Sequence, residues 1–249
     1  MSSTAETELI QLFSFDLIEF IRLFSLCQWS LPVKSFEAGR VDCMSNEVQG
    51  NGAGTRRRDQ ILEVALKIFA ERGFDGTTMR AIAEEAGTTA TLVIYHFATK
   101  NRLYEAIFER YQYLNEERRQ QVLEVDTSSS DAVERIVDAF LLPTLRAQET
   151  ADGKLFARLT LREAADPSAS NRDILAAYFD PMARDFIRVM RKALPDKPKG
   201  FHEWAYLFGV GALTGTALPH RMSSLSSEDI NEFRFDYLRE VLVSGWRGR

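Results

Sequence analysis

The side chains that could do chemistry gather between residues 56 and 100, and most of them are hydrogen-bond donors. Three consecutive arginines open this segment, and threonines, a tyrosine, a histidine and a lysine follow. Groups of this kind bind phosphates and base edges, whereas catalysis needs an activated nucleophile or a placed acid and base. The sequence contains no carboxylate pair at a recognisable spacing, no nucleophile motif and no phosphate-cradling glycine loop. We therefore expect a binding protein and not an enzyme.

Charge is unevenly distributed along the chain. The 249 residues carry a net charge of −5, which argues against a generally basic nucleic-acid coat. Residues 55–102 instead hold eight Lys and Arg against six Asp and Glu, a local net charge of +2. Because electrostatic steering depends on where charge sits, this segment can attract nucleic acid although the whole chain is acidic.

Cysteine and histidine usage excludes the common metal sites. The two cysteines are Cys27 and Cys43, and the three histidines are scattered without ligand spacing. This pattern excludes a disulfide framework and a thiolate cluster, and it fits a reducing cytoplasm. We expect neither a metal nor a cofactor.

The first 54 residues differ from the rest of the chain. Residues 9–31 are apolar, but Asp16, Glu19 and Arg22 make a membrane span unfavourable by about 2.5–3.5 kcal/mol each. An amphipathic helix on a membrane or a partner stays open. Residues 45–54 are a polar, glycine-rich linker, opened by Met44. Either Met44 is the translation start and residues 1–43 are an upstream extension, or the segment is a regulatory helix.

Helical periodicity dominates after the linker, and no run alternates strictly between apolar and polar residues. The pattern predicts an all-α fold of about nine helices, in which residues 55–102 form one domain and residues 103–249 a larger one. Gly73 is expected to end the first helix in the left-handed conformation, with Phe74 packing back. Pro143 and Pro181 are each expected inside a helix.

The stretch from Thr77 to Lys100 reads TTMRAIAEEAGTTATLVIYHFATK. Its β-branched run could be a strand, but the residues that begin and end helices favour two short helices. Thr78 is a good N-cap for the first, Gly87 ends it, and Thr89 caps the second. Two short helices around a glycine turn, preceded by an apolar helix, form a helix-turn-helix unit, whose second helix enters the DNA major groove.

Residues 57–104 resemble the DNA-binding domain of the tetracycline-repressor (TetR) family. The resemblance implies a homodimeric transcription regulator, usually a repressor, that leaves its palindromic operator when a small ligand binds the C-terminal helices. The matching residues are Ile61, Leu62, Ala65, Phe69, Gly73, Phe74, Thr77, Thr78, Ile82, Ala83, Ala86, Gly87, Tyr95, His96, Phe97, Lys100 and Leu103.

The resemblance and the residue chemistry together assign roles in DNA binding. A basic arm before the first helix is expected to neutralise phosphates or reach a minor groove. Arg80 would read a base, or else pair with Glu84 on the surface. The start of the second short helix would reach base edges, and its end would bind phosphates. The expected DNA-binding residues are Arg56, Arg57, Arg58, Thr78, Arg80, Thr89, Ala90, Thr91, Ile94, Tyr95, His96 and Lys100.

One residue of this set departs from the family pattern. Many relatives carry Tyr or Asn where this chain has Ile94, and Ile94 has no hydrogen-bond donor. Either Ile94 meets a thymine methyl group, or a backbone contact is lost. For Tyr95, packing as a core aromatic between helices is the alternative to phosphate binding.

The larger domain carries an aromatic and methionine-rich inner set, which is either ordinary helical core or the lining of a mostly apolar pocket. The run FARLTLREAADP (156–167) resembles a pattern in family members that sense fatty acids or their thioesters. Alternatively, Arg158, Arg162 and Glu163 form a solvated helix face or pair between helices. The effector would then be lipophilic, either fatty acyl or aromatic. The expected ligand-binding residues are Phe108, Tyr111, Phe140, Phe156, Arg162, Tyr178, Met182 and Phe186.

The last two helices, expected over residues 201–218 and 228–246, are where the family dimerises through a four-helix bundle. The expected interface residues are Trp204, Phe208, Gly211, Gly215, Phe233 and Tyr237. The alternative to a ligand-responsive DNA-binding regulator is a helical ligand- or partner-binding protein that has weakened or lost DNA binding.

Overall fold

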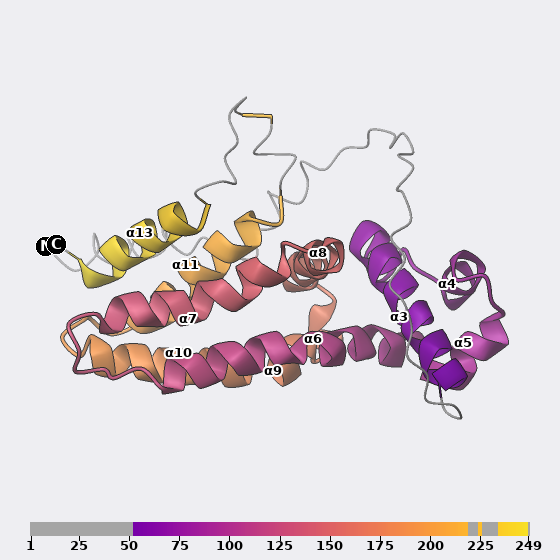
Figure 1. The fold of residues 1–249 in the computed structure, drawn as a ribbon, viewed down its shortest axis with the longest axis horizontal. Coiled ribbons are helices and arrows are strands. Elements are labelled where there is room, and N and C mark those ends of the chain that lie inside the picture. The colour runs from indigo at the N-terminus through magenta and orange to yellow at the C-terminus, as the bar shows by residue number, and fades with distance from the viewer. Residues whose placement is uncertain (1–51, 219–223, 226–233, 249) are drawn as a thin grey trace, which may run out of the picture. The chain divides into compact units, whose positions relative to one another are not determined.

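A computed structural model describes residues 52–218, 224–225 and 234–248 (Figure 1). These residues form ten α-helices and one short 3₁₀ turn, without a β-strand, which confirms the all-α prediction. Within them, no helix combines the length and the apolar character needed to cross a membrane. Phe233 and most of the N-terminal segment discussed above lie outside the described residues.

The first three described helices form the predicted helix-turn-helix unit. Helix α3 spans Gly52–Arg72, α4 spans Met79–Glu85 and α5 spans Ala90–Phe97. The side chain of Thr78 accepts a hydrogen bond from the Ala81 amide, and Thr89 accepts one from the Leu92 amide. Each threonine satisfies an amide that the helix leaves unpaired. The cap at Thr89 thus helps to hold the β-branched residues Thr91, Val93 and Ile94 helical against their own propensity.

Two glycines end helices in this unit. Gly73 follows α3 with a φ of +74°, and Gly87 follows α4 with a φ of +60°. The Thr88 amide donates to the Ala83 carbonyl, and the Gly87 amide donates to the Glu84 carbonyl. This pair of bonds is a Schellman motif, and it requires the left-handed conformation that glycine adopts without strain. The turn between α4 and α5 is therefore encoded locally.

The joint between α5 and the next helix is strained. Ala98 has a φ of 59° and a ψ of −55°, and the Thr99 amide donates to the Phe97 carbonyl across it. These values and this bond describe a γ-turn of the rare, strained kind, here centred on a residue with a Cβ atom. Thr99 then caps α6, which spans Lys100–Leu123.

The remaining helices pack on α6 or, in the case of the last two, on the helices that cover it (Figure 1). They are α7 (Ala132–Ala147), α8 (Ala151–Ala165), the 3₁₀ turn η1 (Ala169–Asn171), α9 (Ile174–Tyr178), α10 (Asp180–Ala193), α11 (Phe201–Gly215) and α13 (Arg234–Arg247). Pro143 lies inside α7, as expected. The expectation for Pro181 was wrong, because the expected helix divides at Phe179 and Pro181 lies in the first turn of α10, where its missing N–H costs no hydrogen bond.

Two hydrophobic clusters hold the described residues together, and α6 contributes to both. The first contains the helix-turn-helix core together with Phe156 and Leu159 of α8, and α6 supplies residues from Leu103 to Leu114. The second lies among α7, α10, α11 and α13, and Val122 near the end of α6 belongs to it. The first cluster therefore continues past residue 102, where the boundary between the two domains was expected, and includes the first half of α6.

A buried polar junction connects α8 to the helix-turn-helix unit. Glu163 is 1% exposed, and its carboxylate accepts hydrogen bonds from the Tyr104 hydroxyl at 2.9 Å and from Arg172 Nη2 at 2.8 Å. Arg172 also bonds Asp166 and lies over the Phe74 ring at 4.7 Å. Burial, followed by the nearby Glu163 carboxylate, raises the pKa of the Tyr104 phenol well above its ordinary value.

We expect Ala98→Gly to raise the free energy of unfolding by about 1 kcal/mol, because glycine adopts positive φ without the clash that Cβ causes. Urea titration followed by circular dichroism measures this change. Ala81→Gly, in the middle of α4, is the matched control and should lower stability by a similar amount. A loss of stability in both variants would contradict a strained joint at Ala98.

Candidate nucleic-acid interface

Helix α5 is held from one side, and its other side is open. Val93 is fully buried and Phe97 is 5% exposed, so these two residues anchor the helix to the core. Ile94 is 50% exposed and Tyr95 is 81% exposed. Thr89 and Thr91 are exposed and Ala90 is half-buried. The residues expected to reach base edges thus form the open side of one short helix, opposite its buried anchors.

Helix α4 places Arg80 in its first turn with a free guanidinium. Arg80 is exposed and has no hydrogen-bond or ion-pair partner in the described part of the chain, so the expected alternative pairing with Glu84 does not form. Thr78 caps the helix with its oxygen, which leaves its hydroxyl hydrogen available to a phosphate. Lys67 of α3 forms a solvent-exposed ion pair with Glu85 at the end of α4, at 3.0 Å.

The three arginines do not form an arm before the first helix, which corrects that expectation. Helix α3 begins at Gly52, inside the expected linker, so all three lie on its surface. Arg57 donates to the Gln60 side chain at 2.9 Å, and the Arg58 guanidinium lies 4.9 Å from the Phe97 ring centre. Arginine and glutamine favour helix, so the helix continues through them toward the N-terminus. Contacts to phosphate stay a prediction, whereas an extended minor-groove arm does not fit this geometry.

Lys100 makes contacts within the protein that its sequence did not predict, and its expected phosphate contact stays a prediction. Its ammonium donates to the Phe74 carbonyl at 3.0 Å and to the Thr77 carbonyl at 3.1 Å, and it lies 4.1 Å from the Phe74 ring centre. Two of its three N–H donors are therefore used to hold the loop between α3 and α4. The sequence pattern identified an important lysine, but the contacts make it a positioning residue.

Tyr95 and His96 lie side by side at the end of α5. Their ring centres are 5.3 Å apart in an edge-to-face arrangement. The exposure of Tyr95 removes the alternative that it is a core aromatic, because a core ring would be covered by the neighbouring helices. His96 is half-buried. Both side chains stay candidates for phosphate contacts.

The eight expected ligand-binding residues do not surround one cavity. Phe108, Tyr111, Phe156 and Tyr178 belong to or pack against the first hydrophobic cluster. Tyr111 and Phe156 are stacked with ring centres 4.1 Å apart. Phe140, Met182 and Phe186 belong instead to the second cluster. The reading of these residues as ordinary core therefore describes their packing, because each ring fills space between helices.

Arg162 also points elsewhere than expected. Its guanidinium donates to the carbonyls of Ala70 at 2.8 Å and Glu71 at 2.9 Å, at the C-terminal end of α3. Cations at a helix C-terminus complement the helix dipole. Together with Glu163, Arg162 makes the inter-helix pairing that was the alternative interpretation of the run 156–167.

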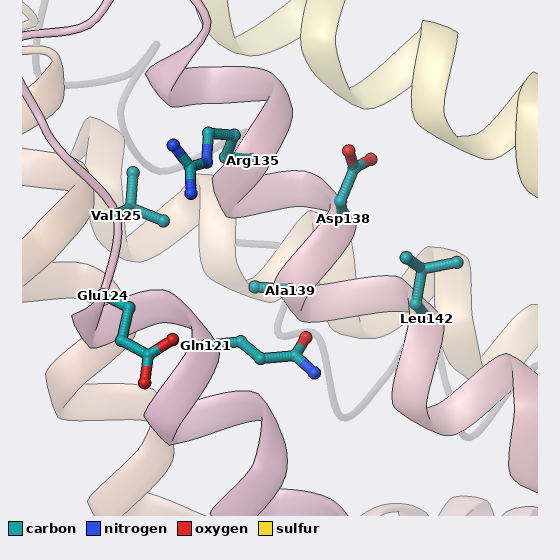
Figure 2. A pocket seen from close by; sticks show the side chains of 7 residues that line it. All are labelled: Gln121, Glu124, Val125, Arg135, Asp138, Ala139 and Leu142. Atoms are coloured by element: carbon teal, nitrogen blue, oxygen red, sulfur yellow. The ribbon is translucent and has the colours of Figure 1, made fainter.

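A shallow pocket of about 250 Å³ lies between the end of α6 and the start of α7 (Figure 2). Its lining shares no residue with the expected ligand-binding set, and Asp138 in it already pairs with Arg239 at 2.6 Å. The lining residues are Gln121, Glu124, Val125, Arg135, Asp138, Ala139 and Leu142.

Helices α11 and α13 expose large apolar side chains. Trp204 is 50% exposed, Phe208 is 66% exposed and Tyr237 is 62% exposed. Gly211 and Gly215 have open space where a Cβ would lie, so neither of them brings two of the described helices together. That close approach occurs at Gly209, where an added Cβ would lie 3.0 Å from the Phe140 ring.

Sequence reasoning missed Arg118, which is 6% exposed on α6. The sequence pattern of α6 could have identified this residue. Tyr111, Leu114, Arg118 and Val122 recur at the spacing of one helix face, so a charged residue stands in an otherwise apolar, buried stripe.

Two family models match separate parts of the chain. Residues 61–107 match the family described as "Bacterial regulatory proteins, tetR family". Residues 138–244 match the family described as "Tetracyclin repressor-like, C-terminal domain". Both matches lie after the N-terminal segment, and together they include the helix-turn-helix unit and helices from α7 to α13.

Two proteins of similar sequence are named as transcriptional regulators. The repressor KstR2 of Mycolicibacterium smegmatis is 36% identical over 72 residues, which cover 29% of this chain and 35% of that one. The regulator SrpR of Pseudomonas putida is 25% identical over 151 residues, which cover 61% of this chain and 66% of that one. This chain thus spans less than two thirds of the length of either relative.

Solved structures share the fold at low identity. The hemolysin II regulator HlyIIR aligns with a TM-score of 0.54 at 18% identity, over 77% of this chain and 99% of that one. The fatty acid degradation regulator FadR from Bacillus halodurans aligns with a TM-score of 0.53 at 16% identity, over 82% of this chain and 100% of that one. At these identities the likeness shows the fold alone.

We expect Lys100→Met to lower the free energy of unfolding by about 1–2 kcal/mol, because the carbonyls of Phe74 and Thr77 lose a charged donor. Arg80→Ala, the matched loss of a cation on the same unit, should leave the unfolding midpoint unchanged, because Arg80 has no partner to lose. Chemical denaturation of the three proteins measures both effects. Equal stability of Lys100→Met and the unaltered chain would contradict the positioning role.

Proposed function

Because the chain belongs to the TetR family of bacterial regulatory proteins, we propose that it is a ligand-responsive repressor that binds an operator as a homodimer. The observation that carries this proposal is the geometry of α5. Its caps and buried anchors fix the helix, while its exposed side holds residues that can contact DNA. A rigid short helix of this kind fits the major groove of B-DNA.

On the exposed side of α4 and α5, some side chains would contact bases and others would contact phosphates. Arg80 is uncommitted and can make a bidentate contact with guanine, which contributes about 1–3 kcal/mol of discrimination. Thr89 and Thr91 would reach other base edges. Tyr95 and His96 would contact phosphates, which position the protein without specifying sequence. Ile94 is exposed and apolar, so it suits the methyl group of a thymine.

A second copy of the chain would cover the exposed apolar residues of α11 and α13. Trp204 and Phe208 lie one turn apart on α11, with ring centres 5.9 Å apart. Gly211 and Gly215 leave open space along the same helix, which permits a close approach by another helix. Two such pairs of helices would form a four-helix bundle around a two-fold axis, which matches the symmetry of a palindromic operator.

The effector would be a small lipophilic molecule that binds among the C-terminal helices and releases the repressor from DNA. The two clusters give these helices an aromatic interior of matching chemistry, while the pocket described above is lined by other residues. FadR, with which the chain shares its fold, is described as a regulator of fatty acid degradation, so fatty acyl compounds join aromatic acids as candidates. The proposed site of action is the cytoplasm.

We expect selection from random double-stranded DNA to enrich a palindrome, because the proposed dimer presents two α5 helices. Arg80→Ala should bind the enriched sequence less tightly and tolerate substitution at one position of each half-site, at a cost of about 1–3 kcal/mol. Sequencing of the selected pools and gel-shift titration at fixed salt measure both effects. Thr127→Ala, far along the chain from α5, is the control and should leave the selected motif unchanged.

Flat enrichment in that experiment would overturn the proposed function. It would favour a helical ligand- or partner-binding protein that has lost DNA binding, for which Ile94 at a usually polar position is the supporting observation.

We expect Phe208→Asp to weaken dimerisation by about 30-fold or more, because a carboxylate would be buried in an apolar interface. Sedimentation equilibrium measures the dissociation constant. Tyr113→Asp is the matched control, since Tyr113 is 56% exposed on α6, outside the proposed interface. A dimer that withstands Phe208→Asp, or dissociates equally with Tyr113→Asp, would contradict an interface on α11 and α13.

A further inference from the structure

The second hydrophobic cluster encloses a cation that its own residues do not neutralise. Arg118 of α6 is 6% exposed. Its Nε donates to the Phe140 carbonyl at 3.0 Å, and its Nη1 donates to the Asn115 side chain at 3.0 Å. Nη2 is buried and has no hydrogen-bond partner among the described residues. The guanidinium therefore holds unused donors, shielded from water.

Arg172 is a second buried guanidinium, and its partners differ from those of Arg118. The Arg172 side chain is also 6% exposed, but it pairs with Glu163 at 2.8 Å and with Asp166 at 2.5 Å. Arg118 has no acidic partner in the described part of the chain. Burial lowers the pKa of its guanidinium to about 10. A buried charge is stable when it is paired and fully hydrogen-bonded, and Arg118 is neither.

The surroundings of Arg118 suit a molecule with an apolar body and one negative group. The guanidinium carbon lies 4.2 Å from the Phe140 ring centre. The rings of Phe140, Phe186 and Tyr206 lie together, with centres between 4.9 and 6.0 Å apart. Tyr206 of α11 is partly exposed, so this aromatic group reaches the surface. The Asn115 amide is partly committed, because one of its N–H groups donates to the Tyr178 carbonyl and its oxygen accepts from Arg118.

We propose that Arg118 binds the anionic group of the effector, and that the effector is an amphipathic carboxylate whose apolar part packs against these aromatic rings. The carboxylate accepts the hydrogen bond that Nη2 offers and neutralises the buried charge. The inference rests on the proposed function, because it names the class of molecule that the C-terminal helices sense. Arg118 was not among the eight residues expected to bind the ligand, whose one charged member, Arg162, bonds the end of α3 instead.

Isothermal titration calorimetry of the full chain without DNA tests this proposal. The probes are two matched pairs, decanoate with 1-decanol and 3-phenylpropionate with 3-phenyl-1-propanol. At least one carboxylate should bind about 30-fold or more tightly than its alcohol, because only the carboxylate pairs with the buried cation. Arg118→Gln keeps N–H donors for the Phe140 carbonyl but removes the charge, so it should abolish this preference.

Arg119→Gln is the matched control. Arg119 is the next residue of α6, but it is partly exposed and pairs with Asp185 at 2.5 Å, so the carboxylate preference should survive its loss. Arg118→Lys keeps a cation at the site and should retain part of the preference, which makes the test informative even if Arg118→Gln does not fold.

Three outcomes would overturn the inference. They are carboxylates that bind no more tightly than their alcohols, a preference that persists in Arg118→Gln, and a preference that Arg118→Lys and Arg119→Gln lose alike. Failure of the proposed function would look different, because DNA selection would then be flat whatever the calorimetry shows. A chain that selects a palindrome but ignores the carboxylates loses only this inference.

Discussion

The Glu163 carboxylate imposes the constraint on which the described structure depends. It is buried, so it needs both the Tyr104 hydroxyl and the Arg172 guanidinium to offset its lost hydration. Tyr104 packs edge-to-face against Phe69 and Phe74, which belong to the helix-turn-helix unit. One buried charge thus ties α3, α6, α8 and the turn after α8 together. Moving any of them away would leave an unpaired charge inside the protein.

Features that arise within a few residues of sequence were predictable. The caps at Thr78 and Thr89 and the left-handed glycines at 73 and 87 each depend on hydrogen bonds to neighbours three to five residues away. Such contacts follow from residue type and spacing alone, so they predicted the helix-turn-helix unit and the open side of α5. They even outweighed the β-branched composition of α5, because each cap satisfies amides that a strand would not present in that way.

Features that depend on distant partners were not predictable in the same way. Lys100 bonds carbonyls more than twenty residues away, and Arg162 bonds carbonyls more than ninety residues away. Helical periodicity predicts that such a residue faces other helices, but it does not predict which carbonyl the side chain will contact. The aromatic residues divide between two clusters for the same reason, since a helix face does not specify its neighbour. Arg118 was visible as a charge in an apolar stripe, yet only tertiary packing shows that it lacks a counter-ion.

The γ-turn at Ala98 has a mechanical consequence. Only Ala98 and Thr99 separate α5 from α6, and the first is fixed by its own turn while the second is fixed as a cap. A longer loop would absorb a rotation of α6 as slack. The two-residue connection between α5 and α6 has almost no conformational freedom, so the orientation of α6 sets the orientation of α5. The direction in which the open side of α5 faces is therefore set by the long helix and not by the short one.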